Sequence, residues 1–315
     1  MYDLIIIGGA AVGCSAAIYA ARRKLNFRII TQNVGGEVAL SGETNNWPGI
    51  ISIQGYELAQ KFAEHVKSYG VNIEEGWWVE NLVPGTKYHT VVAKNPQGKT
   101  EELKAKTVII GTGIHPRHLK VPGEEELNHK GVTYCTVCDG PLYKNKDTVT
   151  IGSGNSALES VLMMAEIAKQ AYIISKYPDT PETQGGFPKG DKILIDKVKA
   201  DPRIKVIYEA MTAEILGTTK VEGIKYREAN GAEQQLPVQG VMVHVGMIPN
   251  SQFATALTRN KQGEIVIDGR CHTSAEGIFA GGDVTDIPHK QIGIAAGHGI
   301  IAALEAIGYV NLWKE

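Results

Sequence analysis

Near its start the chain passes from a continuous apolar run into a glycine-rich turn and then into a helical pattern. Asp3–Ile7 predicts a buried strand, Gly8–Gly13 a turn, the residues up to Arg23 a helix, and Phe27–Thr31 a second strand. A strand, turn, helix and strand within roughly 30 residues is the size of one βαβ unit.

The same order of patterns returns 144 residues later, counted from Gly8 to Gly152. A strand, Thr148–Ile151, is followed by a glycine-rich turn, a helix to about Ala168 and the strand Ala171–Ser175. Two such units at this distance predict two nucleotide-binding domains of α/β class rather than a solenoid.

Proline and glycine mark the places where the chain is expected to pass between these domains. Pro116 and Pro122 indicate a first crossing, and His244–Pro249 indicates a second one. Towards the C-terminus the pattern predicts a strand, Ile278–Ala280, and a long helix, Gly293–Ile307. No segment has the composition of a flexible linker.

Composition narrows the class of protein. A chain of 315 residues with 43% hydrophobic and 21% charged residues suits two ordinary globular domains, and 36 glycines are typical of nucleotide-binding folds. The net charge of −2 gives no electrostatic footprint for nucleic acid. No apolar run is expected to approach the roughly 20 residues that span a bilayer, and the N-terminus lacks a secretory signal. We therefore expect a cytoplasmic protein without membrane contact.

The two glycine-rich turns have the character of dinucleotide sites. A pyrophosphate needs backbone amides at a helix N-terminus with no side chains in the way. Gly152, Gly154 and Ala157 meet this requirement in full. In the first turn Ala10 stands at the middle glycine, which narrows the approach without closing it.

The residues that would contact the adenine ribose lack the usual acid. An NAD site places Asp or Glu about 20 residues after the first glycine, whereas a 2′-phosphate prefers Arg. The first unit has Gln32 and Asn33 there, and the second has Ser175 and Lys176. The ribose contacts are therefore expected to be neutral or, at Lys176, cationic.

Cys135 and Cys138 form the most informative motif of the chain. A Cys-x-x-Cys spacing brings two sulfurs close enough for a reducible disulfide and lowers the pKa of one thiol. Asp139 follows directly and is placed to exchange the proton that thiol–disulfide chemistry requires.

A structural zinc site is the alternative interpretation of this motif. Such a site needs four ligands, and no second Cys-x-x-Cys and no closely following His accompany the pair. The remaining cysteines are isolated: Cys14 on the first helix and Cys271 in a strand-like segment, both expected to be buried thiols. No metal is expected.

These motifs, in this order, resemble the low-molecular-weight thioredoxin reductases of bacteria and archaea over essentially the whole chain. The similarity rests on segments beginning at Ile5, Val34, Asn45, Thr112, Cys135, Gly152, Gly281 and His289. The motif Cys135–Gly140 just ahead of the second glycine-rich turn is highly specific to this family. The flavoprotein reductases of alkyl hydroperoxide systems share the Lys-Gln-Ile segment but carry an additional N-terminal redox domain.

The resemblance implies two Rossmann-like, three-layer domains. Residues 1–113 and 244–315 would form a discontinuous FAD domain, and residues 114–243 an inserted pyridine-nucleotide domain carrying the cysteines. The residues expected to bind FAD are Gly8, Ala10, Ala11, Gly35, Gly36, Glu37, Asn46, Thr112, Gly113, Gly282, Asp283, Gln291 and Ile292. Asp283 would hold the ribityl chain. Those expected to bind NADPH or NADH are Gly152, Gly154, Asn155, Ser156 and Lys176.

By the same analogy a nicotinamide reduces FAD, FAD reduces the disulfide, Cys138 faces the flavin, and Cys135 attacks the disulfide of thioredoxin. Serving both partners implies rotation of the inserted domain about the two crossings. A homodimer is also expected.

The chain departs from the family where NADPH would be recognised. Members that use NADPH have a basic cluster after the second strand of the inserted domain, whereas this chain has Ser175–Pro178 with only Lys176 basic. Asn155 replaces the usual Asp, and the loop Asp179–Gly190 is unlike the family's. The donor is therefore left open among NADH, weakly bound NADPH and a ferredoxin.

Two other functions remain open from the sequence. The protein partner is thioredoxin or, with the same chemistry, a peroxiredoxin or glutaredoxin-like protein, since docking surfaces carry no motif. A flavin-bound redox sensor without turnover is the least favoured hypothesis, because both cysteines and Asp139 are intact.

Overall fold

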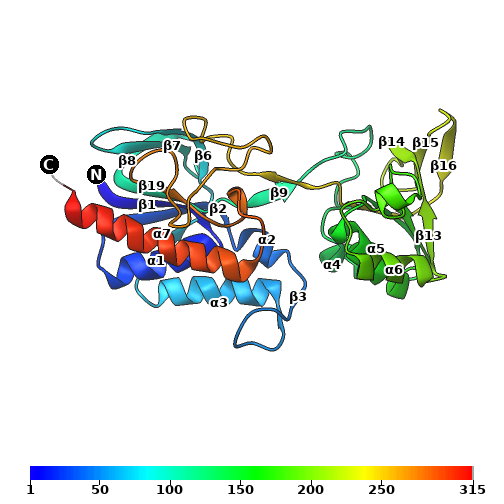
Figure 1. Cartoon of the computed structure of the whole chain (residues 1–315), viewed down its shortest axis with the longest axis horizontal. Helices are drawn as coiled ribbons and strands as arrows, with labels where there is room; N and C mark the ends of the chain where they lie inside the picture. The colour runs from blue at the N-terminus through cyan, green and yellow to red at the C-terminus, as the bar shows by residue number, and fades with distance from the viewer. Residues whose placement is uncertain (314–315) are drawn as a thin grey trace. The chain divides into compact units, whose positions relative to one another are not determined.

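The computed structural model describes residues 1–313, and the chain divides into two compact units. Unit one holds Met1–His115 and the chain from Ile248 onward, and unit two holds Pro116–Met247. The chain passes between the units in β9 (Ile114–Pro116) and β18 (Met247–Pro249), which pair as a two-stranded ribbon (Figure 1). Both passages therefore fall at the proline-marked segments.

Unit one is built on a seven-stranded sheet in the order β5–β2–β1–β8–β7–β6, with β19 also paired to β8. The strands β5, β2, β1, β8 and β19 run parallel, while β6 and β7 form an antiparallel extension. A two-stranded sheet, β3 with β4, lies apart from it. The strands are β1 (Tyr2–Gly9), β2 (Phe27–Val34), β3 (Glu43–Thr44), β4 (Ile53–Gln54), β5 (Ile73–Glu74), β6 (Trp78–Val83), β7 (His89–Lys94), β8 (Thr100–Ile110) and β19 (Ile278–Ala280).

Three helices cover one face of this sheet: α1 (Ala11–Arg22), α3 (Gly55–Lys67) and α7 (Ile292–Leu312) (Figure 1). The β-branched residues of β1 are buried, as a parallel strand covered on both faces requires. Alanines of α1 pack against alanines of α7 in one core cluster, which small side chains permit at close helix spacing. The short helices α2 (Gly36–Ala39) and η3 (Gly282–Val284) follow β2 and β19.

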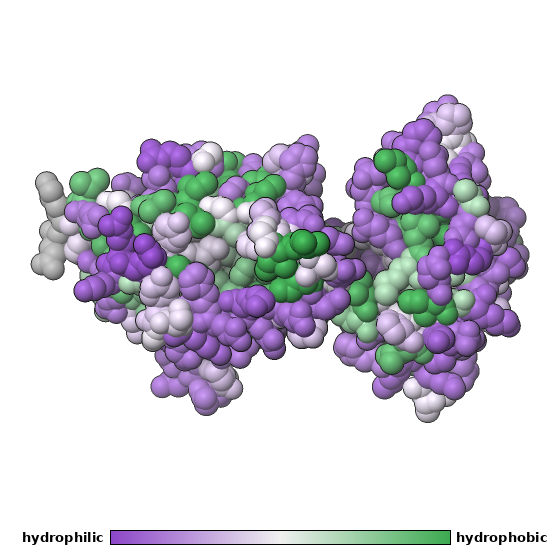
Figure 2. Space-filling model, turned by 90° about the horizontal axis from the view of Figure 1, so that it is seen from below, coloured by the Kyte–Doolittle hydropathy of each residue, from purple (hydrophilic) through white to green (hydrophobic). Residues whose placement is uncertain are grey.

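Helix α7 corrects the expectation that no apolar segment approaches the length of a bilayer. Among residues 1–313 it is the one helix that is long and apolar enough to cross a membrane by length and composition, with 21 residues. The core helix of a globular protein passes the same test, and α7 buries its alanine face against α1. The face of the molecule in Figure 2 is mostly hydrophilic, broken by separate apolar patches.

Unit two has a five-stranded parallel sheet in the order β10–β17–β11–β12–β13 and an antiparallel sheet β14–β15–β16. Its strands are β10 (Val132–Thr133), β11 (Asp147–Ile151), β12 (Gln170–Ile174), β13 (Ile204–Ile207), β14 (Ala210–Leu216), β15 (Gly223–Glu228), β16 (Glu233–Leu236) and β17 (Gly240–Val243). Its helices are α4 (Thr136–Asp139), η1 (Gly140–Tyr143), α5 (Asn155–Ile167), η2 (Pro181–Thr183) and α6 (Lys192–Ala200).

The structure departs from the sequence-based expectations at Cys271. This residue lies in a loop with φ of 65°, not in a strand. Its neighbour His272 makes only an isolated bridge to Phe279, so the apolar pattern there reflects burial rather than a strand. Cys14 and Cys271 are both buried, as expected, and burial raises the pKa of each thiol to about 12.

Candidate active site

The two cysteines of the Cys-x-x-Cys motif are joined as a disulfide. Cys135 is the N-cap of α4, and the backbone amide of Cys138 donates a hydrogen bond to Cys135 Sγ at 3.2 Å. A thiolate at Cys135 would be stabilised by the same amide, because hydrogen bonding to the charged form lowers a pKa. Cys138 is exposed and Cys135 is half-buried.

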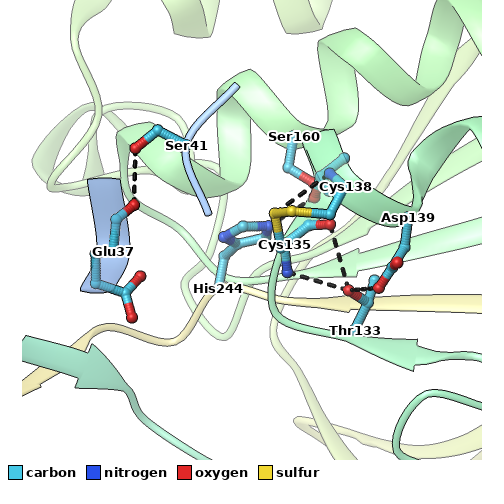
Figure 3. The surroundings of a disulfide bond; sticks show 9 residues. Glu37, Ser41, Thr133, Cys135, Cys138, Asp139, Ser160 and His244 are labelled. Atoms are coloured by element: carbon cyan, nitrogen blue, oxygen red, sulfur yellow. Dashed lines mark hydrogen bonds between the residues drawn. A yellow bond between two sulfur atoms is a disulfide. The ribbon is translucent and has the colours of Figure 1, made fainter. Parts of the chain in front are cut away.

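Asp139 is held beside the disulfide by Thr133. The Thr133 hydroxyl donates to Asp139 Oδ2 at 2.6 Å and accepts the backbone amide of Cys135 at 3.1 Å. Figure 3 shows Asp139 and Thr133 on one side of the Cys135–Cys138 bond. One hydroxyl thus connects the carboxylate to the backbone of the half-buried cysteine, so the acid expected to move a proton is fixed near the sulfurs.

A buried polar network lies under α4, and no local sequence pattern indicated it. The Thr136 hydroxyl is 2.8 Å from His244 Nε2 and 2.6 Å from Ser160 Oγ, which in turn lies 3.2 Å from Thr150 Oγ1 (Figure 3). Burial lowers the pKa of His244 to about 4, so its ring is neutral at physiological pH. The network ties the turn between the cysteines to α5 and to the end of β17.

In unit one the turn after β1 leaves its backbone open at the start of α1. Gly8 has φ of 115°, and a Cβ on it would lie 2.3 Å from the carbonyl oxygen of Gly111, so only glycine fits. Ala10 is the N-cap of α1 and makes no side-chain capping bond, and the first turn, which begins with Ala11, contains no acid. The helix N-terminus is therefore available to an anion such as a pyrophosphate.

Two acids of unit one are held in an environment that calls for a polar partner. Asp283 Oδ1 is buried and has no hydrogen-bond partner within residues 1–313, and burial raises the pKa of Asp283. Burial also raises the pKa of Glu37, with the charge of His115 opposing this rise. A buried unpartnered carboxylate oxygen is costly, and a ligand hydroxyl would satisfy it. This orphaned oxygen and the open turn fit FAD.

The other residues expected at the flavin lie in turns of the same unit. Asn46 Nδ2 donates to Gln291 Oε1 at 3.0 Å, which joins segments 245 residues apart. Thr112 exchanges two hydrogen bonds with Asn250, its hydroxyl donating at 2.7 Å and its carbonyl accepting at 2.8 Å. Positive φ values occur at the expected glycines that shape these turns: Gly35, Gly36, Gly113 and Gly282. Ile292 is the first residue of α7.

In unit two the expected nucleotide residues surround the start of α5. Gly152 follows β11 with φ of 150°, and a Cβ there would lie 2.2 Å from the carbonyl oxygen of His244. Gly154 is the N-cap, and Asn155 and Ser156 open the helix. Lys176 is exposed, with Nζ 5.2 Å from the centroid of the Tyr177 ring.

Comparison with known proteins agrees with this geometry. The family model described as pyridine nucleotide-disulphide oxidoreductase matches residues 2–300. The crystal structure of thioredoxin reductase from Lactococcus lactis has a TM-score of 0.85 at 30% identity, covering 99% of both chains. The crystal structure of thioredoxin reductase from T. acidophilum has a TM-score of 0.81 at 35% identity, covering 98% of both chains. A flavoprotein component of alkyl hydroperoxide reductase from Escherichia coli is 34% identical over 98% of this chain.

The fold and the cysteine pair define a flavin-dependent disulfide oxidoreductase with two Rossmann-like domains. The chain belongs to the pyridine nucleotide-disulphide oxidoreductase family, whose members bind FAD and take electrons from NAD(P)H. The α/β fold class and the resemblance to low-molecular-weight thioredoxin reductases are therefore confirmed. The chain spans 58% of the length of the E. coli relative.

Proposed function

We propose that the chain is a thioredoxin reductase-like enzyme, which passes electrons through FAD to Cys135 and Cys138 and on to a thioredoxin-like protein. The observation that supports this best is the disulfide at the start of α4, with a backbone amide on Cys135 Sγ and Asp139 fixed beside it. The similarity to two thioredoxin reductases over nearly whole chains supports the same activity.

Bound FAD would supply the electron pair that reduces the disulfide. The residues that would hold it are those at the open turn of α1 and around Asp283, whose unpartnered oxygen would accept from a ribityl hydroxyl. Asn46, Thr112 and Gln291 would line the same site. Cys138, which is exposed, would take the electrons first.

The exchange with the partner then balances as follows. The Cys135 thiolate attacks one sulfur of the partner's disulfide, a mixed disulfide forms, and the partner's second sulfur leaves as a thiolate and takes a proton from Asp139 or water. The Cys138 thiolate next attacks Cys135 Sγ, which restores the internal disulfide and releases the partner's first sulfur. Two electrons and two protons have then passed to the partner.

The test follows the flavin colour under anaerobic conditions. The protein is reduced to bleaching, and oxidised thioredoxin, with a couple of about −270 mV, is then added. The expected result is the return of the flavin absorbance with one dithiol formed per flavin. A Cys135→Ser variant that binds flavin equally well is the control and should stay bleached. Flavin that bleaches but never reoxidises with any protein disulfide contradicts the proposal.

A peroxiredoxin-like partner is the second candidate. It is favoured by the identity of 34% with the alkyl hydroperoxide reductase component over 98% of this chain. The same two cysteines would carry out the same exchange on a peroxiredoxin disulfide. Parallel titrations with oxidised thioredoxin, peroxiredoxin and glutaredoxin separate these partners by their rates of flavin reoxidation.

We also place the enzyme in the cytoplasm as a homodimer. A redox-active pair together with two buried free thiols suits a reducing compartment. Light scattering of the purified holoprotein would give the mass of one or two chains directly.

A further inference from the structure

The strand end that should contact the adenine ribose in unit two is covered by the chain itself. Ser175, directly after β12, is fully buried. Its hydroxyl donates to the carbonyl oxygen of Gly186 at 2.5 Å and accepts the amide of Tyr177 at 3.2 Å. In dinucleotide-binding folds this position contacts the ribose hydroxyls or the 2′-phosphate. Here it is closed by the segment Tyr177–Gly190, which we term the covering loop.

The covering loop is anchored at several points. Phe187 is fully buried in the core cluster that contains Ala157 and Leu158 of α5, and it meets the Tyr208 ring edge-on at 6.3 Å. Asp179 forms an ion pair with Lys199 at 2.6 Å. A loop held by a buried aromatic side chain and an ion pair does not leave its place without breaking core packing.

The same loop reaches the glycine that should lie under the pyrophosphate. Lys189 pairs with Gly154 in an isolated parallel bridge, and a Cβ on Gly154 would lie 3.8 Å from Lys189 Cβ. The middle glycine of the motif exists so that a pyrophosphate can approach the backbone. In this chain the space over that glycine faces Lys189.

A negative charge of the protein already lies at the helix N-terminus. Asn155, the first residue of α5, donates to Asp191 Oδ2 at 2.8 Å and accepts the amide of Asp191 at 2.7 Å. Because a helix N-terminus attracts one anion, the Asp191 carboxylate opposes a second one. Lys176 is the one basic residue in Ser175–Pro178, and that segment contains no acid for a ribose hydroxyl.

We propose that this second dinucleotide site is closed to both NADPH and NADH by the covering loop and Asp191. The inference rests on the proposed function, since it concerns where that enzyme can take its electrons. The fold is that of a nicotinamide-binding domain, but the residues present do not fit the nucleotide. Reducing equivalents therefore reach this protein by a route that does not use the α5 turn.

The test measures binding of NADPH and of NADH, each alone, to the flavin-loaded protein by calorimetry. Working nicotinamide sites typically bind between about 1 μM and 1 mM. The expected dissociation constant is weaker than about 100 μM for both nucleotides, and a tighter value for either one overturns the proposal.

Two charge variants give a matched comparison. Asp191→Asn keeps the contacts to Asn155 but removes the charge, and is expected to tighten NADH binding about two- to fivefold, the effect of one charge at a helix N-terminus. Glu182→Gln removes a charge from the same loop, away from that helix, and should leave binding unchanged. Equal binding by wild type and Asp191→Asn overturns the closure by charge.

A nucleotide-free arm separates this inference from the proposed function. The flavin is photoreduced without any nicotinamide, and oxidised thioredoxin is added. Reoxidation upholds the disulfide reductase activity whatever the nucleotide titrations give. Failure to reoxidise contradicts that activity, while the titrations still decide whether the site is closed.

Discussion

Thr136 lies between the two redox cysteines, and its hydroxyl joins them to the interior of unit two. It contacts His244 Nε2 at 2.8 Å and Ser160 Oγ at 2.6 Å. Thr136→Val keeps the side-chain shape and removes both bonds. The buried His244 nitrogen then loses this partner, at about 1–3 kcal/mol, whereas Ser160 keeps its contact to Thr150 and loses about 0.5–1.5 kcal/mol. The free energy of unfolding of unit two should fall by about 2–4 kcal/mol.

The assay uses the uneven distribution of tryptophan. Trp47, Trp77, Trp78 and Trp313 all belong to unit one, so their fluorescence reports on that unit, while far-ultraviolet circular dichroism reports on both. In urea, Thr136→Val should shift the circular dichroism transition to lower denaturant. The control Thr136→Ser keeps the hydroxyl and should lose only about 1 kcal/mol, the worth of one buried methyl group. Equal midpoints for wild type and Thr136→Val, or an equal loss in both variants, would refute the role of the hydroxyl.

Three further predictions concern the cofactor, the cysteines and pH. Asp283→Ala should weaken FAD binding to the apoprotein about 10- to 150-fold, the value of one hydrogen bond to a charged group; unchanged affinity in a fluorescence titration would remove Asp283 from the flavin site. Cys138→Ser should accumulate a mixed disulfide with thioredoxin that mass spectrometry detects, and Cys135→Ser should not; the reverse pattern would exchange their roles. The depressed pKa of His244, about 4 against 6.5, means that unit two keeps its full stability above pH 6.5 and loses up to roughly 3 kcal/mol as pH falls towards 4. His244→Gln should flatten this dependence in denaturation curves at pH 7 and pH 4.5, and an unchanged slope would contradict the assignment.

Local patterns were sufficient for much of this protein. The strand, turn and helix that begin each Rossmann-like unit follow from residues within about 30 positions of one another, because periodicity and glycine chemistry act locally. The disulfide between Cys135 and Cys138 was likewise predictable, since three residues of separation already place the sulfurs together. The length of α7 was not, because Gly and Ala interrupt its apolar pattern while packing closely on α1.

The tertiary structure alone decided which distant residues meet. His244 follows β17 and Thr150 lies in β11, and these strands are neighbours in the parallel sheet although more than ninety residues separate them in the chain. Strand order therefore brings His244, Ser160 and Thr136 together, and no local pattern encodes that order. The glycine motif of unit two predicted an open nucleotide site, but the motif fixes only the backbone of the turn. Whether the space above Gly154 is free depends on the fold of Tyr177–Gly190, because the burial of Phe187 in the core draws that loop across it.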